Sequence, residues 1–210
     1  MTTTDTATTD TTSTDTATTM AATAGTSTST PPTERNGVPV AKLRGTIAKM
    51  TDDPSLAAFR FSARNTWIEG TATRSTIHEW YGAGSDQVHV EEFSATADHP
   101  TLGHGHGPTP QEYVLHALAA CIAAGVATTA ANRDIELRRI DTTVRGTIDV
   151  RGVLGIDPDV RNGFDMIEVD VDVDGDAPRE ALDALIAASA RRSAVFDIIT
   201  SPTTVVVGPA

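Results

Sequence analysis

The pattern of apolar and polar positions predicts a helix followed by strands in the first half of the chain. Apolar residues such as Val40, Leu43 and Ile47 recur every three to four positions, which predicts an amphipathic helix over 38–50. Over 59–97 apolar and polar residues alternate, and Gly-containing turns divide this segment into three stretches. We therefore expect a three-stranded antiparallel meander after the helix.

A long apolar segment forms the centre of the sequence. Thr109, Pro110 and Glu112 fit a capping box, with Thr at the N-cap and Glu at the third helical position. The helix is expected to run from Pro110 to about Asn132, roughly 34 Å at 1.5 Å per residue. Residues 117–127 have no polar face, which predicts burial on all sides. Because many of these residues are small, a second copy of the helix can approach closely, and we expect a symmetric homodimer.

The second half of the chain alternates again between strand and helix patterns. Strands are predicted over 135–150 and 166–173, and a helix is predicted to start at Asp176 as N-cap and to end near 191–192. A last strand is expected over 203–207. The order of elements predicts an α+β fold.

Composition divides the chain into three segments. Sixteen of the first 32 residues are Thr, and residues 1–35 are expected to form a disordered tail because they cannot offset their ordering entropy. This tail has neither the basic start nor the apolar region of a secretory signal. Residues 36–57 are interpreted as a helical extension and 58–210 as a single domain.

Charge and cysteine content exclude several classes of function. The formal net charge is -12, with 16 Lys and Arg against 28 Asp and Glu, so no basic cluster is present to bind nucleic acid. No apolar run reaches the ~18 residues that span a bilayer, so we expect no membrane partner and a cytoplasmic location. Cys121 is the single cysteine, so the chain cannot form an intrachain disulfide.

Cys121 is the main candidate for chemistry. A lone cysteine among alanines is either inert packing or a reactive thiol, and a reactive thiol needs a cation or donor that stabilises the thiolate. The cysteine lies too deep in the predicted helix for the N-terminal dipole to lower its pKa. Candidate cations are Arg74, His104, His106 and His116.

No metal or cofactor is expected. His104 and His106 are spaced like a chelating pair, but the chain offers no C-x-x-C or H-E-x-x-H pattern to complete a ligand set. The aspartates that alternate with valines over 170–176 fit the solvated face of a strand rather than a calcium-binding loop.

Three motifs in order resemble one family. They are GPTPQEYVLHALAAC over 107–121, Trp67-Ile-Glu-Gly70 followed by Arg74, and Ser193-Ala-Val-Phe-Asp197 followed by Pro202. In these motifs and in element order, residues 58–207 resemble the OsmC/Ohr family, bacterial proteins of thiol-dependent organic hydroperoxide reduction. The opening NGVPVAKLRGTI and the insert LGIDPDVRNGF are similar to a single-cysteine subgroup with an extra N-terminal helix.

The resemblance implies a fold and a site. The fold would be an OsmC-like intertwined dimer, with long central helices packed between antiparallel sheets and active sites at the subunit interface. Cys121 would be the peroxidatic cysteine and Arg74 the arginine that holds it as a thiolate. The thiolate would attack the peroxide O–O bond and leave a sulfenic acid and an alcohol.

The resemblance also marks the other candidate site residues. His104, His106, Ser193 and Phe196 would contribute to binding near the thiol. Ser193 stands where the family's resolving cysteine would be, and Thr101 stands near the position of the family's arginine-orienting glutamate. A hydroxyl cannot resolve a sulfenic acid, so an external thiol or dithiol would have to do so.

Three hypotheses follow from these observations. The first is a one-cysteine reductase of organic hydroperoxides, part of an oxidative-stress response, with a hydrophobic peroxide as substrate. The second is a non-catalytic protein that binds a small apolar ligand on the same fold. The third is another thiol chemistry, such as acyl transfer with His104 or His106 as base. The pKa of Cys121 discriminates between the first two.

Overall fold

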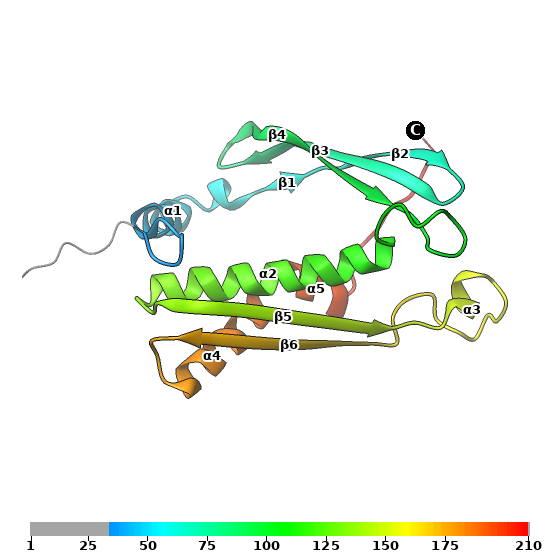
Figure 1. Ribbon diagram of the computed structural model, residues 1–210. Helices are drawn as coiled ribbons and strands as arrows, with labels where there is room; N and C mark the ends of the chain where they lie inside the picture. Colours follow the sequence, from blue (N-terminus) through cyan, green and yellow to red (C-terminus); the bar gives the residue numbers. More distant parts are fainter. Residues whose placement is uncertain (1–33, 210) are drawn as a thin grey trace, which may run out of the picture. The chain divides into compact units, whose positions relative to one another are not determined.

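The computed structural model describes residues 34–209 (Figure 1). The expected disordered tail over 1–35 lies almost entirely outside the described residues, and the boundary at residue 58 stays a prediction. The predicted first helix is confirmed as α1 (Val40–Asp52), which begins two residues later than expected. The short 3-10 helix η1 (Pro54–Ala57) follows it.

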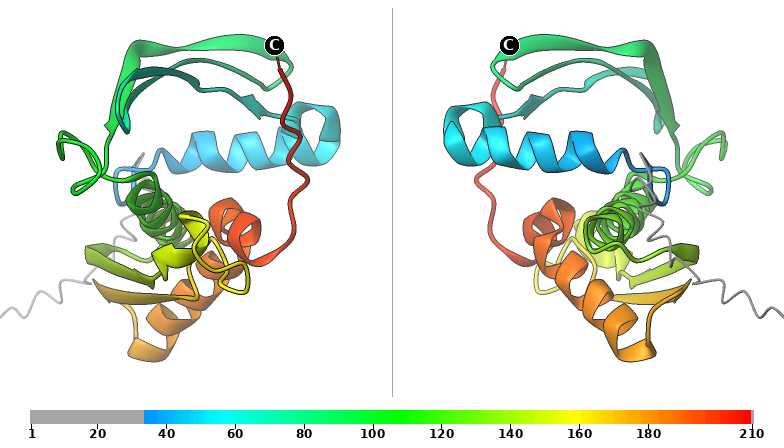
Figure 2. Two further views of the ribbon diagram at one scale, coloured as in Figure 1. Left: turned by 90° about the vertical axis from the view of Figure 1, so that its right-hand side faces the viewer. Right: turned by 90° about the vertical axis from the view of Figure 1, so that its left-hand side faces the viewer.

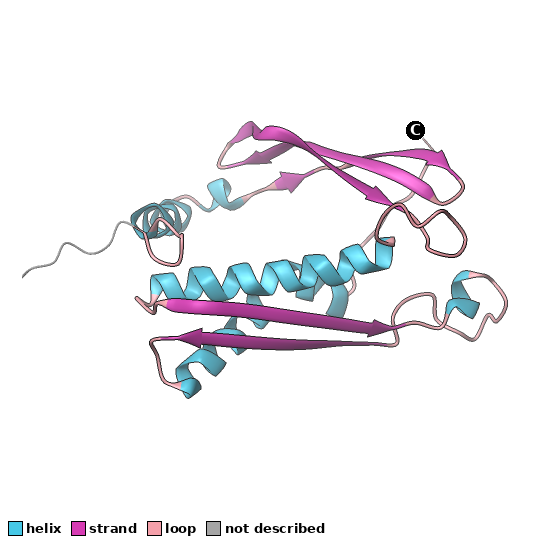
Figure 3. Ribbon diagram, in the orientation of Figure 1, coloured by secondary structure: helices cyan, strands magenta, loops and turns pink. Residues whose placement is uncertain are grey.

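The predicted antiparallel meander is present, but it has four strands rather than three and is built around β3. Its strands are β1 (Arg60–Phe61), β2 (Arg64–Glu69), β3 (Ala72–Gly82) and β4 (Ser85–Ala97). β1 and β2 pair with one side of β3, and β4 pairs with the other side. Figure 3 distinguishes these strands from the helices.

The predicted central helix is α2 (Pro110–Asn132), and both halves of its capping box are formed. Its buried face packs on a sheet of two antiparallel strands, β5 (Leu137–Thr147) and β6 (Met166–Gly175), and on α4 (Arg179–Arg192) (Figures 1 and 2). The core cluster consists of Leu118, Ile122, Val126, Ala130, Val173, Leu182 and Leu185. α2 is therefore the central support of this half of the chain.

Burial of α2 on all sides is not observed in the single chain. Glu112, His116, Ala120 and Ala124 recur every four residues and form an exposed stripe. The expectation of burial on all sides was wrong for one subunit because β5, β6 and α4 cover only the opposite face of α2.

α2 is also long and apolar enough to cross a membrane, which corrects the expectation that no apolar segment of the chain is long enough to do so. This is weak evidence, because the core helices of soluble proteins pass the same test.

The start of α4 differs from the prediction. Pro178 stands at the N-cap and no side chain caps the helix. The Asp176 carboxylate instead accepts a hydrogen bond of 2.8 Å from the backbone N–H of Glu136. In the segment predicted as strand 135–150, the strand ends at Thr147, and the short helix α3 (Val150–Val153) begins at the last residue of that segment.

The C-terminal segment also differs from the prediction. An unpredicted helix, α5 (Ala194–Thr200), follows α4, and residues 203–207 form no strand. Val205, Val206 and Val207 are 78%, 90% and 91% exposed. A strand needs a partner strand, and within the part of the chain that the structure describes this segment pairs with none.

Candidate functional site

Cys121 lies where α2 and α4 approach each other closely. Gly125 is one helical turn beyond Cys121, on the same face of α2. A Cβ atom at Gly125 would lie 3.1 Å from the Cβ of Ser189 in α4, so the missing side chain permits the approach. Ser193 follows one turn after Ser189, and the two serines therefore face the glycine and the cysteine of α2.

The half-buried thiol of Cys121 is surrounded by hydrogen-bond donors. Burial alone would raise its pKa, but the Ser193 hydroxyl and the backbone N–H groups of Val195 and Ala194 lie close enough to the sulfur to lower it. These donors favour the thiolate, so the pKa of Cys121 lies below its ordinary value. Within the described chain, the groups that lower the pKa of the sulfur are neutral donors at the start of α5, and the predicted cation stays a prediction.

Ser193 has two roles at this point of the fold. It is 4% exposed, and its Oγ accepts a hydrogen bond of 3.1 Å from the backbone N–H of Phe196 as the N-cap of α5. The same hydroxyl donates toward the sulfur of Cys121. Ser193 stands where the family resemblance implies a resolving cysteine. In this structure it is therefore a capping residue that also stabilises the thiolate.

The thiol opens onto a cavity of ≈ 590 Å³. α1 contributes apolar side chains to its wall, whereas α2 and α4 contribute hydroxyl groups and two arginines come from the helix ends. The lining residues are Leu43, Ile47, Cys121, Ala124, Gly125, Thr128, Thr129, Asn132, Arg133, Ser189, Arg192 and Ser193. The lining of the cavity thus combines apolar side chains from α1 with polar side chains from α2 and α4.

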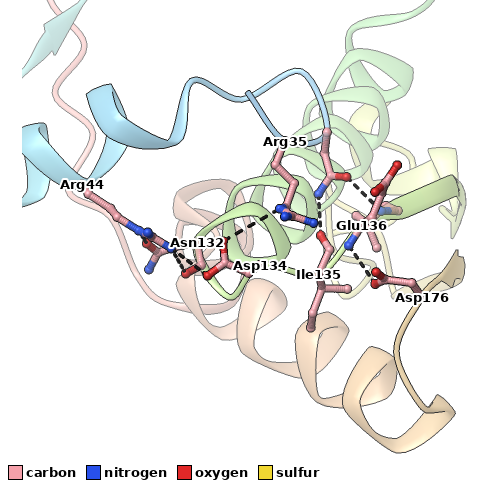
Figure 4. Close-up of polar contacts among 9 residues, drawn as sticks. Arg35, Arg44, Asn132, Asp134, Ile135, Glu136 and Asp176 are labelled. Carbon is pink, nitrogen blue, oxygen red and sulfur yellow. Dashed lines mark hydrogen bonds and ion pairs between the residues drawn. The ribbon is translucent and has the colours of Figure 1, made fainter. Parts of the chain in front are cut away.

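The position of α1 beside this cavity is fixed by polar contacts (Figure 4). The Asn36 amide donates to the carbonyl of Ile135 (3.0 Å) and accepts from the N–H of Leu137 (2.8 Å). Asn36 and Gly37 both have positive φ, which turns the chain sharply before the helix.

A second contact holds the middle of α1. The Arg44 guanidinium donates to the side-chain and backbone oxygens of Asn132, at 3.2 and 2.9 Å, and to Asp134 at 3.2 Å. Arg44 follows Leu43 directly, so this contact places the apolar side chains of α1 over the end of α2.

Arg74 does not line the Cys121 cavity in the described chain. It is exposed near the start of β3, opposite Thr66 on β2 and Thr96 on β4. Its role as thiolate partner stays a prediction, and within one subunit the donors at the sulfur come from Ser193 and the start of α5.

His104 and His106 lie in a loop that is built around Asp98. Their rings stack at 5.5 Å between centroids, and their backbone N–H groups donate to Oδ2 of Asp98 at 3.0 and 3.2 Å. The side chain of Thr71 and the backbone N–H of His99 donate to Oδ1, each at 2.7 Å. Neither His104 nor His106 is among the cavity residues, and Phe196, which also does not line the cavity, donates its backbone N–H to Ser193.

Asp98 is a residue whose role the sequence did not reveal. The Thr71 hydroxyl and the three backbone N–H groups hold the pKa of this buried carboxyl far below its ordinary range. A Cβ at Gly103 would lie 2.0 Å from Oδ1 of Asp98, so the loop can fold around the carboxylate only with glycine there.

Among the described residues, no group of three His, Cys, Asp or Glu side chains could hold a metal ion.

The comparisons with known proteins decide the family. The family model described as OsmC-like protein matches residues 103–208, half of the chain. The chain belongs to the OsmC-like protein family. No curated protein matches it. The matched region of this OsmC-like chain contains Cys121, Ser193 and all of the cavity except the α1 residues.

Solved structures support the same fold. An OsmC-like protein from Mycoplasma pneumoniae has a TM-score of 0.52 and 17% identity, over 68% of this chain and 88% of that one. The organic hydroperoxide resistance protein OhrB of Bacillus subtilis has a TM-score of 0.42 and 21% identity, over 67% and 92%. An organic hydroperoxide resistance protein from Legionella pneumophila has a TM-score of 0.44 and 13% identity, over 68% and 90%.

The OsmC-like fold class predicted from the sequence is thereby confirmed. The Mycoplasma structure carries this conclusion, and the two lower-scoring structures add no argument to it. The single-cysteine subgroup and the intertwined dimer stay predictions, although α1 is present as a helix ahead of the matched region.

Proposed function

We propose that this OsmC-like chain reduces organic hydroperoxides through Cys121 alone, with an external thiol as reductant. The observation that carries the proposal is the set of donors at the sulfur: the Ser193 hydroxyl and the N–H groups of Ala194 and Val195. A thiolate with a lowered pKa beside an open cavity is the arrangement that a thiol peroxidase needs. Relatives named for hydroperoxide resistance are consistent with it.

The first step forms a sulfenic acid. The Cys121 thiolate attacks one peroxide oxygen, the O–O bond breaks, and its electron pair leaves with the alkoxide. The alkoxide takes a proton and departs as an alcohol, while the sulfur is oxidised to Cys–SOH. The Ser193 hydroxyl and the α5 N–H groups stabilise the thiolate until the attack.

The second stage returns the thiol. One external thiol condenses with the sulfenic acid to give a mixed disulfide and water, and a second thiol releases Cys121 with formation of the external disulfide. Two thiols are oxidised for each hydroperoxide reduced. No second cysteine exists in the chain to replace the external thiol.

The proposed active form is a homodimer. The exposed stripe of α2 contains Ala120 and Ala124, and the meander sheet carries exposed aromatic side chains, among them Phe61 (76%) and Trp67 (67%). Cover by a second copy would bury both surfaces. In such a dimer Arg74 on β3 of one subunit would reach the Cys121 thiolate of the other, as the family resemblance implies.

A second candidate function is the binding of a small ligand without catalysis. The apolar wall that Leu43 and Ile47 give to the cavity favours it, because such a wall suits an apolar body. In that case Cys121 would be a lining residue with ordinary reactivity.

Intact-mass spectrometry after a brief pulse of micromolar cumene hydroperoxide tests the proposal. A sulfenic-acid trap is present, and Cys121→Ser is the matched variant. A rapid, saturable adduct on the wild type that is absent from the variant supports the one-cysteine reductase. An adduct that forms only at gross peroxide excess contradicts it and favours the ligand-binding function.

A further inference from the structure

α1 contributes the part of the Cys121 cavity wall that lies outside the region matched by the family model. Leu43 and Ile47 line the cavity, and every other lining residue belongs to α2, to α4 or to the position directly after one of these helices. The matched region begins at residue 103, whereas α1 ends at Asp52. The thiol therefore lies in the part that the chain shares with its family, and the apolar wall lies outside that part.

The cavity extends along one face of α2. Cys121, Gly125, Thr128 and Asn132 follow one another at intervals of three to four residues, and all of them line it. At 1.5 Å per residue, Asn132 lies about 16 Å along the helix from Cys121. The Thr128 hydroxyl donates to the carbonyl of Ala124 at 2.8 Å, so it needs no partner from a ligand. A molecule that reacts at Cys121 can therefore lie lengthwise in the cavity.

Polar contacts rather than deep apolar packing hold α1 at the far end of this cavity. Val40 is the only buried residue of α1, and Ile47 is 49% exposed. The Arg44 guanidinium donates to the side-chain and backbone oxygens of Asn132 at 3.2 and 2.9 Å. Because Arg44 follows Leu43 directly, this contact also places Leu43 and, one helical turn later, Ile47. The position of the apolar wall therefore depends on Arg44.

We propose that α1 determines which reactants Cys121 accepts, because it gives the cavity an apolar wall for the body of an elongated molecule. Leu43 and Ile47 contact that body, and Arg44 is a positioning residue that acts through them. An apolar chain that covers these side chains removes their surface from water, which stabilises the complex. The inference rests on the proposed function in one respect, that Cys121 is the reacting atom.

Two reactants of the proposed cycle can carry the elongated apolar body. One is the organic hydroperoxide and the other is the external thiol, since both must reach the sulfur of Cys121. A short reactant of either kind makes no contact with α1 and gains none of the binding free energy that the wall provides. The shared chemistry is an apolar chain that extends away from the reacting atom.

Alkylation of Cys121 tests the role of α1 without any peroxide. N-decyl and N-methyl iodoacetamide both lose iodide as the thiolate forms the C–S bond, and they differ only in the alkyl chain. The ratio of their rates cancels any change in thiolate fraction. We expect a higher decyl-to-methyl ratio for the wild type than for glutathione as a free thiol, and we expect the Leu43→Ser/Ile47→Ser double variant to lower it about three- to ten-fold.

Met50→Ser is the matched control for the double variant. Met50 is a half-buried apolar residue of α1 that does not line the cavity. The proposal predicts that this variant leaves the decyl-to-methyl ratio unchanged, even where it lowers Tm. A wild-type ratio equal to that of glutathione, or a ratio that Met50→Ser lowers as much as the double variant does, overturns the proposal.

Arg44→Gln tests the positioning role. We expect it to lower the decyl-to-methyl ratio in the wild-type background and to have no further effect in the Leu43→Ser/Ile47→Ser background, because Arg44 acts only through those two side chains. Lys42→Gln removes an exposed α1 cation that does not line the cavity, and it should leave the ratio unchanged. Equal effects of Arg44→Gln in the two backgrounds contradict the positioning role.

Long and short reactants of each kind then identify which one uses the wall. n-Octyl and ethyl hydroperoxide are compared in sulfenic-acid formation, and 1-octanethiol and ethanethiol are compared in mixed-disulfide formation. A preference for the octyl reactant in either step, lost in the double variant, supports the proposal and names the reactant. Equal rates within both pairs contradict it.

The outcomes separate this inference from the proposed function. A decyl-to-methyl ratio that falls in the double variant, without sulfenic acid from either hydroperoxide, supports the role of α1 and removes the peroxide reductase. Rapid sulfenic-acid formation with a ratio that the double variant leaves unchanged removes the role of α1 alone.

Discussion

At the scale of single residues, the site depends on polar side chains that have more than one partner. Ser193 caps α5 through the N–H of Phe196 and also donates toward Cys121. Asp98 accepts four hydrogen bonds and organises the loop that leads into α2. Substitution of either residue therefore affects local structure and chemistry together.

Asp98→Asn is expected to destabilise the protein. The amide retains one acceptor oxygen and presents an NH₂ group to two of the four donors, so buried donors lose their partners. We expect a fall in Tm of about 5 °C, measured by calorimetry at neutral pH. Asp86→Asn is the matched control, because that carboxylate is 91% exposed, and it should leave Tm nearly unchanged.

The pH dependence of this effect has a definite sign. Folding lowers the pKa of Asp98, so the stability it contributes is present above the ordinary aspartate pKa of about 4 and is lost as the pH falls below it. The difference in Tm between wild type and Asp98→Asn should therefore shrink on acidification below about pH 4. A difference that stays constant down to pH 2 would contradict the assignment.

At the scale of elements, the approach of α4 to α2 brings the serines to the thiol. Gly125→Leu is expected to separate the two helices, since even a Cβ would lie 3.1 Å from Ser189. We expect a lower Tm and slower alkylation of Cys121 by iodoacetamide. Gly45→Leu on α1 is the control, because a Cβ there meets nothing within 4 Å. Equal effects of the two substitutions would show that the helix contact does not support the thiol.

The elements themselves were largely predictable where local signals decide them. The capping box at Thr109 and the alternation in β3 and β4 are local, and the structure confirms both. The prediction of a strand over 203–207 was wrong because strand formation depends on pairing with a neighbouring strand rather than on valine content. The helix α5 was missed although Ser193 and Asp197 give a cap and an acidic first turn.

The site was predictable only in its central residue. The motif around Cys121 identified the thiol, whereas its donors come from Ser193 and the backbone N–H groups of Ala194 and Val195. These lie about 70 residues away in sequence, and only the packing of α4 on α2 brings them to the sulfur. Ser189 and Arg192 likewise line the cavity only because α4 packs on α2, and no sequence motif identified them.

At the scale of the whole molecule, the exposed apolar surfaces predict association. The α2 stripe that includes Ala120 and the valines at 205–207 are exposed in one chain. Ala120→Arg is expected to convert a homodimer into a monomer by placing a charge in the interface. Light scattering after size exclusion measures the molar mass. Ala184→Arg on the exposed side of α4 should leave a dimer intact, and a monomeric wild type would contradict the dimer.

The central claim is that Ser193 and the start of α5 hold Cys121 as a reactive thiolate. The most direct test is the pH profile of Cys121 alkylation by iodoacetamide, in the wild type and in Ser193→Ala. Because folding lowers the pKa, the wild-type rate should reach half its plateau below the pH at which an ordinary cysteine does, and Ser193→Ala should move this midpoint upward. A wild-type midpoint at or above that of free cysteine, unmoved by Ser193→Ala, would contradict the account.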